Sequence, residues 1–135
     1  MTESPILKPV LVFVGSGAGG LLRYALGGLI QTWWGPAFPM GTMLVNISGC
    51  FAKGFLATAF AGQLPLREEY RLVLLVGVLG GYTTFSSFGR ETIVLMEEGA
   101  WARAGAYVLT SVIVGLAAVW LGGLLAGRIW PTAPA

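Results

Sequence analysis

The most informative part of this sequence is Gly77-Val78-Leu79-Gly80-Gly81-Tyr82-Thr83-Thr84-Phe85-Ser86-Ser87-Phe88-Gly89. It lies within a long apolar run, and its two adjacent glycines are followed by hydroxyl and β-branched residues, which make a poor continuous α-helix. In the hydrocarbon of a membrane, a broken helix is tolerated only where it is buried in protein or lines a polar cavity. The stretch therefore predicts a membrane helix broken at about residues 80–84. The alternative interpretation is a glycine-rich face for close helix packing.

Four apolar runs, one of which contains this stretch, lie at about residues 7–30, 40–61, 71–96 and 102–126. Each is close to the roughly 20 residues that a helix needs to cross the hydrocarbon core. Hydrophobic residues make up 56% of the 135-residue chain, charged residues make up 10%, and the mean hydropathy is +0.78. In a soluble domain about a quarter of the residues are charged. We therefore expect an all-α membrane protein in which residues 1–135 form a single domain of four transmembrane helices.

The charged residues near the ends of the spans predict only a weak preference in topology. Lys8, Arg67, Arg71 and Arg128 fall on the side of the membrane that holds both termini, whereas Arg103 falls on the other side, with Arg90 as a second candidate for that side. The positive-inside rule then places the termini in the cytoplasm by a margin of about two or three charges. A chain with so small a bias is able to insert in both orientations. The eight basic residues are scattered singly, which argues against nucleic acid as a partner.

A glycine motif in the first span has two interpretations. Residues 15–20, GSGAGG, match the G-x-G-x-x-G pattern of dinucleotide-binding folds. Such a site needs a turn from strand to helix and an acidic residue about 20 positions later, but no acidic residue follows before Glu68. Close helix packing through small residues is therefore the better explanation.

Polar side chains within the spans are candidates for a functional site, because each is costly in hydrocarbon. Asn46 has two equally good interpretations, as a hydrogen bond that joins two helices or as part of a polar pathway. Arg23 and Lys53 each cost at least ~2.5 kcal/mol at mid-membrane, unless their long side chains reach the interface. Glu91 is the one acidic residue expected within the membrane, just after the break.

Phe85 and Phe88 are three residues apart, so they share one face of the helix that resumes after the break. Such a pair usually packs in a core. Because the edge of an aromatic ring is electropositive, however, two rings can also line a path for an anion without a full charge that would hold it. The Asn46 amide and several hydroxyl groups can supply hydrogen-bond donors along such a path; the hydroxyl groups are those of Thr83, Thr84, Ser86, Ser87, Thr110 and Ser111.

Three motifs on three spans are specific enough to compare with a family: Gly19-Gly20-Leu21-Leu22-Arg23-Tyr24, Gly41-Thr42-Met43-Leu44-Val45-Asn46-Ile47-Ser48-Gly49-Cys50-Phe51 and Gly80-Gly81-Tyr82-Thr83-Thr84-Phe85-Ser86-Ser87-Phe88. With them the chain resembles, over nearly its whole length, the Fluc/CrcB family of fluoride channels. The resemblance implies a fluoride-selective channel in the plasma membrane that exports fluoride by passive electrodiffusion. It also implies an antiparallel homodimer of dual topology, with a structural sodium ion at the dimer interface that is held by the backbone carbonyl groups of Gly80 and Thr83.

The same resemblance implies an anion pathway. Its members would be the pore aromatics Phe85 and Phe88, the pore amide Asn46, the hydroxyl groups of Ser111 and Thr42, and Arg23 near a pore entrance. Lys53 departs from the family pattern, which has an apolar residue there. Its side chain faces the other subunit, faces a wet vestibule, or reaches the membrane interface.

Fluoride is small and strongly hydrated, so a pore must replace its water with hydrogen-bond donors, while fixed charges deep in the pore would hold it too tightly. Two other function classes fit less well. A small proton-coupled multidrug transporter also has four short helices but needs a glutamate in its first span, which has none here. A scaffold subunit needs no broken third helix. An enzyme is the least expected class, because no nucleophile–base pair is visible and the chain has no histidine.

Overall fold

The computed structural model describes residues 6–62 and 66–131 of the chain, and these residues form helices and their connections without any strand. Four helical segments are long and apolar enough to cross a membrane: α1 (Leu7–Trp34), α2 (Met40–Ala61), the segment Glu68–Glu97 and α6 (Trp101–Ile129). The expected all-α membrane protein with four spans is thus confirmed. The helices α1 and α6 continue beyond the expected apolar runs, to Trp34 and Ile129. The residue that follows α1 is Gly35, whose positive φ of 81° suits glycine.

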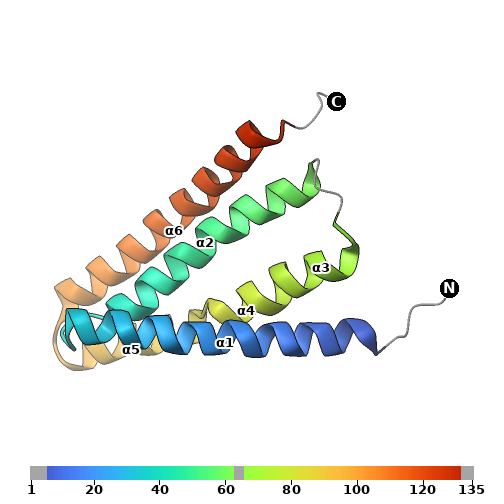
Figure 1. Ribbon diagram of the computed structural model, residues 1–135. Coiled ribbons are helices and arrows are strands. Elements are labelled where there is room, and N and C mark those ends of the chain that lie inside the picture. The colour runs from blue at the N-terminus through green and yellow to red at the C-terminus, as the bar shows by residue number, and fades with distance from the viewer. Residues whose placement is uncertain (1–5, 63–65, 132–135) are drawn as a thin grey trace.

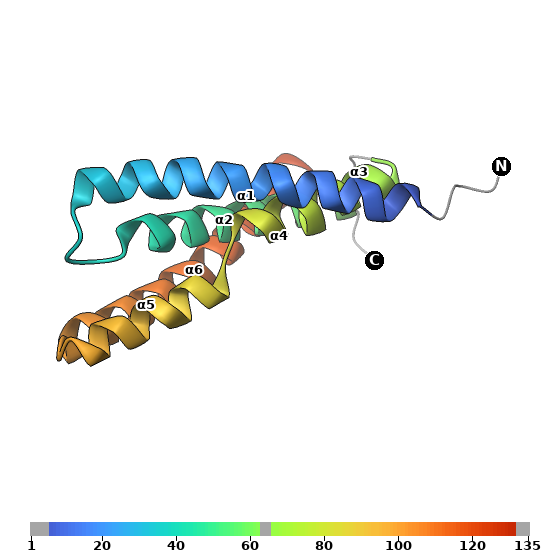
Figure 2. The same ribbon diagram turned by 90° about the horizontal axis from the view of Figure 1, so that it is seen from below.

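The third span consists of several helical pieces. It begins with α3 (Glu68–Leu72), continues as the π-helix η1 (Val73–Val78) and as α4 (Leu79–Tyr82), and resumes as α5 (Phe85–Glu97). Between α4 and α5, Thr83 and Thr84 have extended backbone, with φ/ψ of −84°/156° and −150°/117°. The Thr84 hydroxyl group accepts a hydrogen bond from the Ser87 N–H at 3.2 Å, which caps the start of α5. In Figure 2, α5 leaves the line of α4 at this point and lies beside α6.

Glycines allow α1 to lie close to η1 and α4. A Cβ atom at Gly15 would lie 2.9 Å from the Val73 carbonyl oxygen, and one at Gly19 would collide with the Val78 carbonyl oxygen. Gly17 and Gly20, in contrast, face open space. The glycine motif of the first span therefore serves helix packing, as the sequence predicts, but through a four-residue spacing that the G-x-G-x-x-G pattern does not contain.

A second glycine contact joins α2 to α6, which lie side by side in Figure 1. A Cβ atom at Gly54 would collide with the Val119 carbonyl oxygen, and one at Gly122 would collide with the Phe51 carbonyl oxygen. Without a hydrophobic force between helices in lipid, close backbone approach through small residues is a main source of helix association. Helix α1 thus packs on the third span, and α2 packs on α6. The third span, α2 and α6 together surround one cavity.

Few side chains are buried within the single chain, although most are apolar. One small core surrounds Tyr107, and large apolar side chains are exposed all along the spans, among them Phe13 (79% exposed), Leu21 (72%) and Trp120 (66%). Soluble monomers rarely expose apolar surface on this scale. The chain is therefore built to be covered by lipid or by another polypeptide.

The ends of the spans alternate between the two ends of the molecule. In Figure 1 the start of α1, the end of α2, α3 and the end of α6 lie at one end, while the α1–α2 and α5–α6 connections lie at the other. Lys8 and Arg128 belong to the first end, and Arg103, near the start of α6, belongs to the second. This arrangement matches the sides that the four-span prediction assigns to these charges.

Candidate functional site

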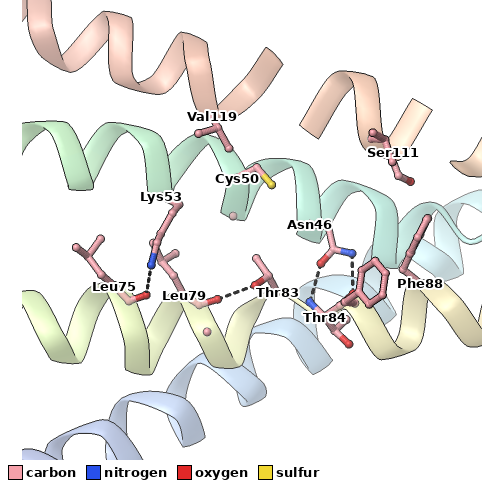
Figure 3. A pocket seen from close by; sticks show the side chains of 14 residues that line it. Asn46, Cys50, Lys53, Leu75, Leu79, Thr83, Thr84, Phe88, Ser111 and Val119 are labelled. Carbon is pink, nitrogen blue, oxygen red and sulfur yellow. Dashed lines mark hydrogen bonds between the residues drawn. The ribbon is translucent and has the colours of Figure 1, made fainter. Parts of the chain in front are cut away.

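A cavity of about 370 Å³ lies between α2, the third span and α6 (Figure 3). Its wall is mostly apolar, and a few polar and aromatic residues converge on it: Asn46 and Lys53 from α2, Gly80, Thr83, Thr84, Phe85 and Phe88 from the third span, and Ser111 from α6. An apolar cavity with a few convergent polar groups is the usual form of a site for a small ligand. The wall of this cavity also includes Thr83 and Thr84, the extended residues between α4 and α5.

Asn46 holds the extended backbone of Thr84 with both ends of its amide. Its Nδ2 donates to the Thr84 carbonyl oxygen at 2.9 Å, and the Thr84 N–H donates to its Oδ1 at 2.7 Å (Figure 3). In an uninterrupted helix the Thr84 N–H would donate to the Gly80 carbonyl group instead. Asn46 therefore joins two helices and also lines the cavity, so the two interpretations of this residue are compatible.

The Thr83 carbonyl oxygen, in the extended stretch between α4 and α5, accepts a hydrogen bond from Arg23. The distance from Arg23 Nη1 to this oxygen is 3.4 Å, and the side chain is partly buried. Arg23 thus reaches the interruption in the third span from α1. Gly80 is exposed, and open space lies where its Cβ atom would be, so its backbone is accessible from outside the chain.

Phe85 and Phe88 form a ring pair on the wall of the cavity. Their ring centroids are 5.6 Å apart, with an angle of 43° between the ring planes. Phe88 also packs against Tyr107, at 5.2 Å between centroids, whereas Phe85 is 83% exposed because nothing in the described part of the chain covers it. The pair therefore has one ring anchored in the core and one ring on the surface.

The hydroxyl groups that the sequence singles out separate into two sets. Thr83, Thr84 and Ser111 line the cavity, whereas Ser86, Ser87 and Thr110 do not. Ser86 and Ser87 lie 3.3 and 3.0 Å from the Thr84 hydroxyl oxygen, in the cap of α5. The Ser111 hydroxyl oxygen is buried and has no hydrogen-bond partner in the described part of the chain. A buried hydroxyl group without a partner is rare and requires an explanation, such as a ligand or a neighbouring molecule.

Thr42 lies outside the lining of the cavity and belongs to a network around Glu91. Its hydroxyl group donates to Glu91 Oε1 at 2.6 Å, and the Tyr107 hydroxyl group donates to Oε2 at 2.6 Å. Glu91 follows Phe88 by three residues, so the network continues the aromatic face of α5. Tyr107 is a member that the sequence prediction missed; its spacing of four residues from Ser111, on one face of α6, is the signal that could have found it.

Lys53 points into the cavity from α2. Its Nζ donates to the Leu75 carbonyl oxygen of η1 at 2.7 Å, and the side chain remains exposed (Figure 3). The Lys53 ammonium group therefore lies at the wall of the cavity, next to η1. A π-helical turn such as η1 is uncommon and is often found at functional sites.

Comparison with known proteins gives consistent matches over almost the whole chain. A family model described as "CrcB-like protein, Camphor Resistance (CrcB)" matches residues 10–123. The chain is 50% identical over 122 residues to a protein of Solibacter usitatus named fluoride-specific ion channel FluC. The matched region covers 90% of this chain and 100% of that relative. Proteins of the same name from Roseiflexus sp. (43% over 122 residues; 90% and 98%) and Coxiella burnetii (42% over 127 residues; 91% and 100%) are also similar.

Proposed function

This chain belongs to the CrcB family, and we propose that it is a fluoride-selective channel through which fluoride leaves the cell by passive electrodiffusion. The family and the four apolar spans make it a multi-pass protein of the plasma membrane. The observation that carries the proposal is the cavity beside Thr83 and Thr84, where an amide, a hydroxyl group and two aromatic rings meet without any carboxylate in the lining.

Two hydrogen-bond donors of this cavity are free to bind an anion. An amide nitrogen carries two hydrogens, and Asn46 Nδ2 donates to one acceptor, the Thr84 carbonyl group, in the described part of the chain. The Ser111 hydroxyl group has no partner there. Together with the electropositive edges of Phe85 and Phe88, these donors can replace part of the hydration shell of fluoride. The donors are neutral, so each site holds the ion weakly enough to release it.

The Glu91 network marks where the route would meet a negative charge. The Thr42 and Tyr107 hydroxyl groups both donate to the carboxylate, so their hydrogens point away from the cavity. We infer that Asn46 and Ser111 act first and that the Thr42 hydroxyl group serves fluoride only after it exchanges its bond to Glu91. The cap hydroxyl groups of Ser86 and Ser87 would act indirectly, by fixing Thr84.

A sodium ion and a second copy of the chain belong to the same proposal. The backbone oxygens of Gly80 and Thr83 would hold the ion, since hard cations prefer oxygen ligands; the Gly80 oxygen has lost its helical donor to Asn46, and the Thr83 oxygen has a second lone pair beside its bond to Arg23. Two oxygens are fewer than the roughly six that such cations take, so we propose that an antiparallel partner supplies the others. The bound ion would contribute a cross-link between the two copies at their interrupted helices.

A proton-coupled multidrug transporter is not favoured. The first span, α1, contains no aspartate or glutamate that could carry a proton. The relatives are named as fluoride channels, and a channel family is not a class of enzyme.

The proposal is tested by measuring ion release from liposomes. The purified chain is reconstituted into liposomes loaded with potassium fluoride or potassium chloride, and release is followed with ion-selective electrodes after valinomycin is added, with equal pH on both sides. We expect rapid release of fluoride, with chloride release no faster than from protein-free liposomes. Fluoride release that requires a pH gradient, or equal release of both anions, would refute a fluoride-selective passive channel.

A further inference from the structure

Lys53 is a charged residue of the cavity that the proposed pathway does not use. We propose that its ammonium group provides a fixed positive charge at one mouth of the cavity, where it concentrates anions before they reach Asn46 and the phenylalanine rings. This inference rests on the proposed conduction of fluoride. It assigns to Lys53 the capture of the ion, whereas selection among anions remains with the neutral donors deeper in the cavity.

The spacing on α2 places Lys53 and Asn46 on one face of the helix. They are seven residues apart, which is about two turns and about 10 Å along the axis, and both line the cavity. Figure 3 shows the Lys53 head beside Leu75 at one end, with Asn46, Phe88 and Ser111 at the other. An anion that enters past Lys53 therefore meets the charge first and the donors afterwards.

The charge of Lys53 is not neutralised by its surroundings. The Leu75 oxygen that accepts its hydrogen bond is an uncharged carbonyl group. Within residues 6–62 and 66–131, the ion pairs are Lys8–Glu68 and Arg90–Glu97, and neither involves Lys53. A cation placed this far inside a span is expensive and usually has a function. Its exposed position keeps it out of the narrow part of the route, where a full charge would trap the ion.

The competing explanation is a structural one, in which Lys53 only ties α2 to η1 through Leu75. Three substitutions separate charge from hydrogen bonding. Lys53→Arg keeps both the charge and the donors, Lys53→Gln keeps a donor without the charge, and Lys53→Met removes both while it keeps a long apolar stem. The Gln variant is the matched control, because a purely structural role predicts that it behaves like the natural chain.

The test measures fluoride flux as a function of fluoride concentration for these three variants and the natural chain. We expect Lys53→Gln and Lys53→Met to raise the concentration for half-maximal flux roughly three- to tenfold, the effect of one charge at about 10 Å in a partly aqueous setting. Their maximal flux and their fluoride-to-chloride ratio should stay unchanged, and Lys53→Arg should match the natural chain. Raising the ionic strength with an impermeant salt should shrink the difference, since screening shortens the reach of the charge.

Each remaining outcome decides against one specific step. Equal half-saturation for Lys53→Gln and the natural chain would overturn the electrostatic role. If Lys53→Met lost maximal flux and unfolded at a lower temperature, with an unchanged fluoride concentration for half-maximal flux, Lys53 would act only by holding α2 to η1. Absence of fluoride flux in the natural chain itself would instead refute the proposed function, so the two failures are distinguishable.

Discussion

Asn46→Asp is the substitution that most directly tests how the cavity handles an anion. It replaces the amide nitrogen with an oxygen at nearly constant volume. The Thr84 N–H can still donate to the side chain, as it now does to Oδ1 at 2.7 Å, but the bond from Nδ2 to the Thr84 carbonyl group is lost. The free N–H that we assign to fluoride is lost as well, and a negative charge takes its place.

The magnitude follows from the geometry. Losing one partner of a partly buried hydrogen bond costs about 1–3 kcal/mol of stability. A carboxylate about 4 Å from an anion in the cavity repels it by about 4 kcal/mol at an effective dielectric constant of about 20. Since about 1.4 kcal/mol is a factor of ten, fluoride release should slow on the order of a thousandfold. The fold should persist, because Thr84 keeps one of its two bonds to residue 46.

Asn46→Ala is the matched control, because it removes both bonds to Thr84 without adding charge. We expect it to lower the thermal unfolding temperature in detergent more than Asn46→Asp does, yet to slow release less, by about ten- to a hundredfold. Liposome release and thermal unfolding should therefore rank the two variants in opposite orders. If Asn46→Ala were worse in both measurements, Asn46 would act only by holding Thr84, and its assigned contact with fluoride would be wrong.

Three further predictions follow from the same structure. Phe85→Ile should slow fluoride release by at least about tenfold in the liposome assay, because the exposed ring of the pair is lost. Phe51→Ile, which lies outside the lining of this cavity, should leave the rate unchanged. Equal rates for the two variants would exclude the ring pair from the route of the anion. Gly19→Ala should destabilise the fold by about 1–3 kcal/mol, since its methyl group meets the Val78 carbonyl group, while Gly17→Ala, which faces open space, should be neutral in thermal unfolding. Replacing sodium with a large organic cation should lower the unfolding temperature of the purified protein and shift it toward monomers in light scattering; no change in either would contradict the proposed sodium cross-link.

The spans are the part of the fold that could be predicted well from the sequence. Their number and approximate limits depend on the length of apolar runs, which the bilayer thickness dictates. Which face of α1 packs was not predictable in the same way. An apolar helix has no polar stripe to orient it, so the choice of Gly15 and Gly19 over Gly17 and Gly20 depends on the shape of η1 and α4. The π-helix η1 likewise has no marker in its residues Val73–Val78.

The candidate site shows the same division. Asn46, Phe85, Phe88, Thr84 and Ser111 were named from the sequence and meet in one cavity. Ser86 and Ser87 were named for their hydroxyl groups, but capping of α5 is a local bond that keeps them beside Thr84 instead. The roles of all these residues in conduction stay predictions until ion release is measured.

The sequence alone determined that this chain is a membrane protein with four spans and with polar groups inside those spans. These properties depend on composition and on the length of each apolar run, which can be read directly along the chain. Only the tertiary structure decided which of those groups meet. Arg23 reaches Thr83 over 60 positions, and Thr42 reaches Glu91 over 49. Such pairings arise from how helices rotate and cross, which is set by the joint packing of all the spans and cannot be read from any one of them.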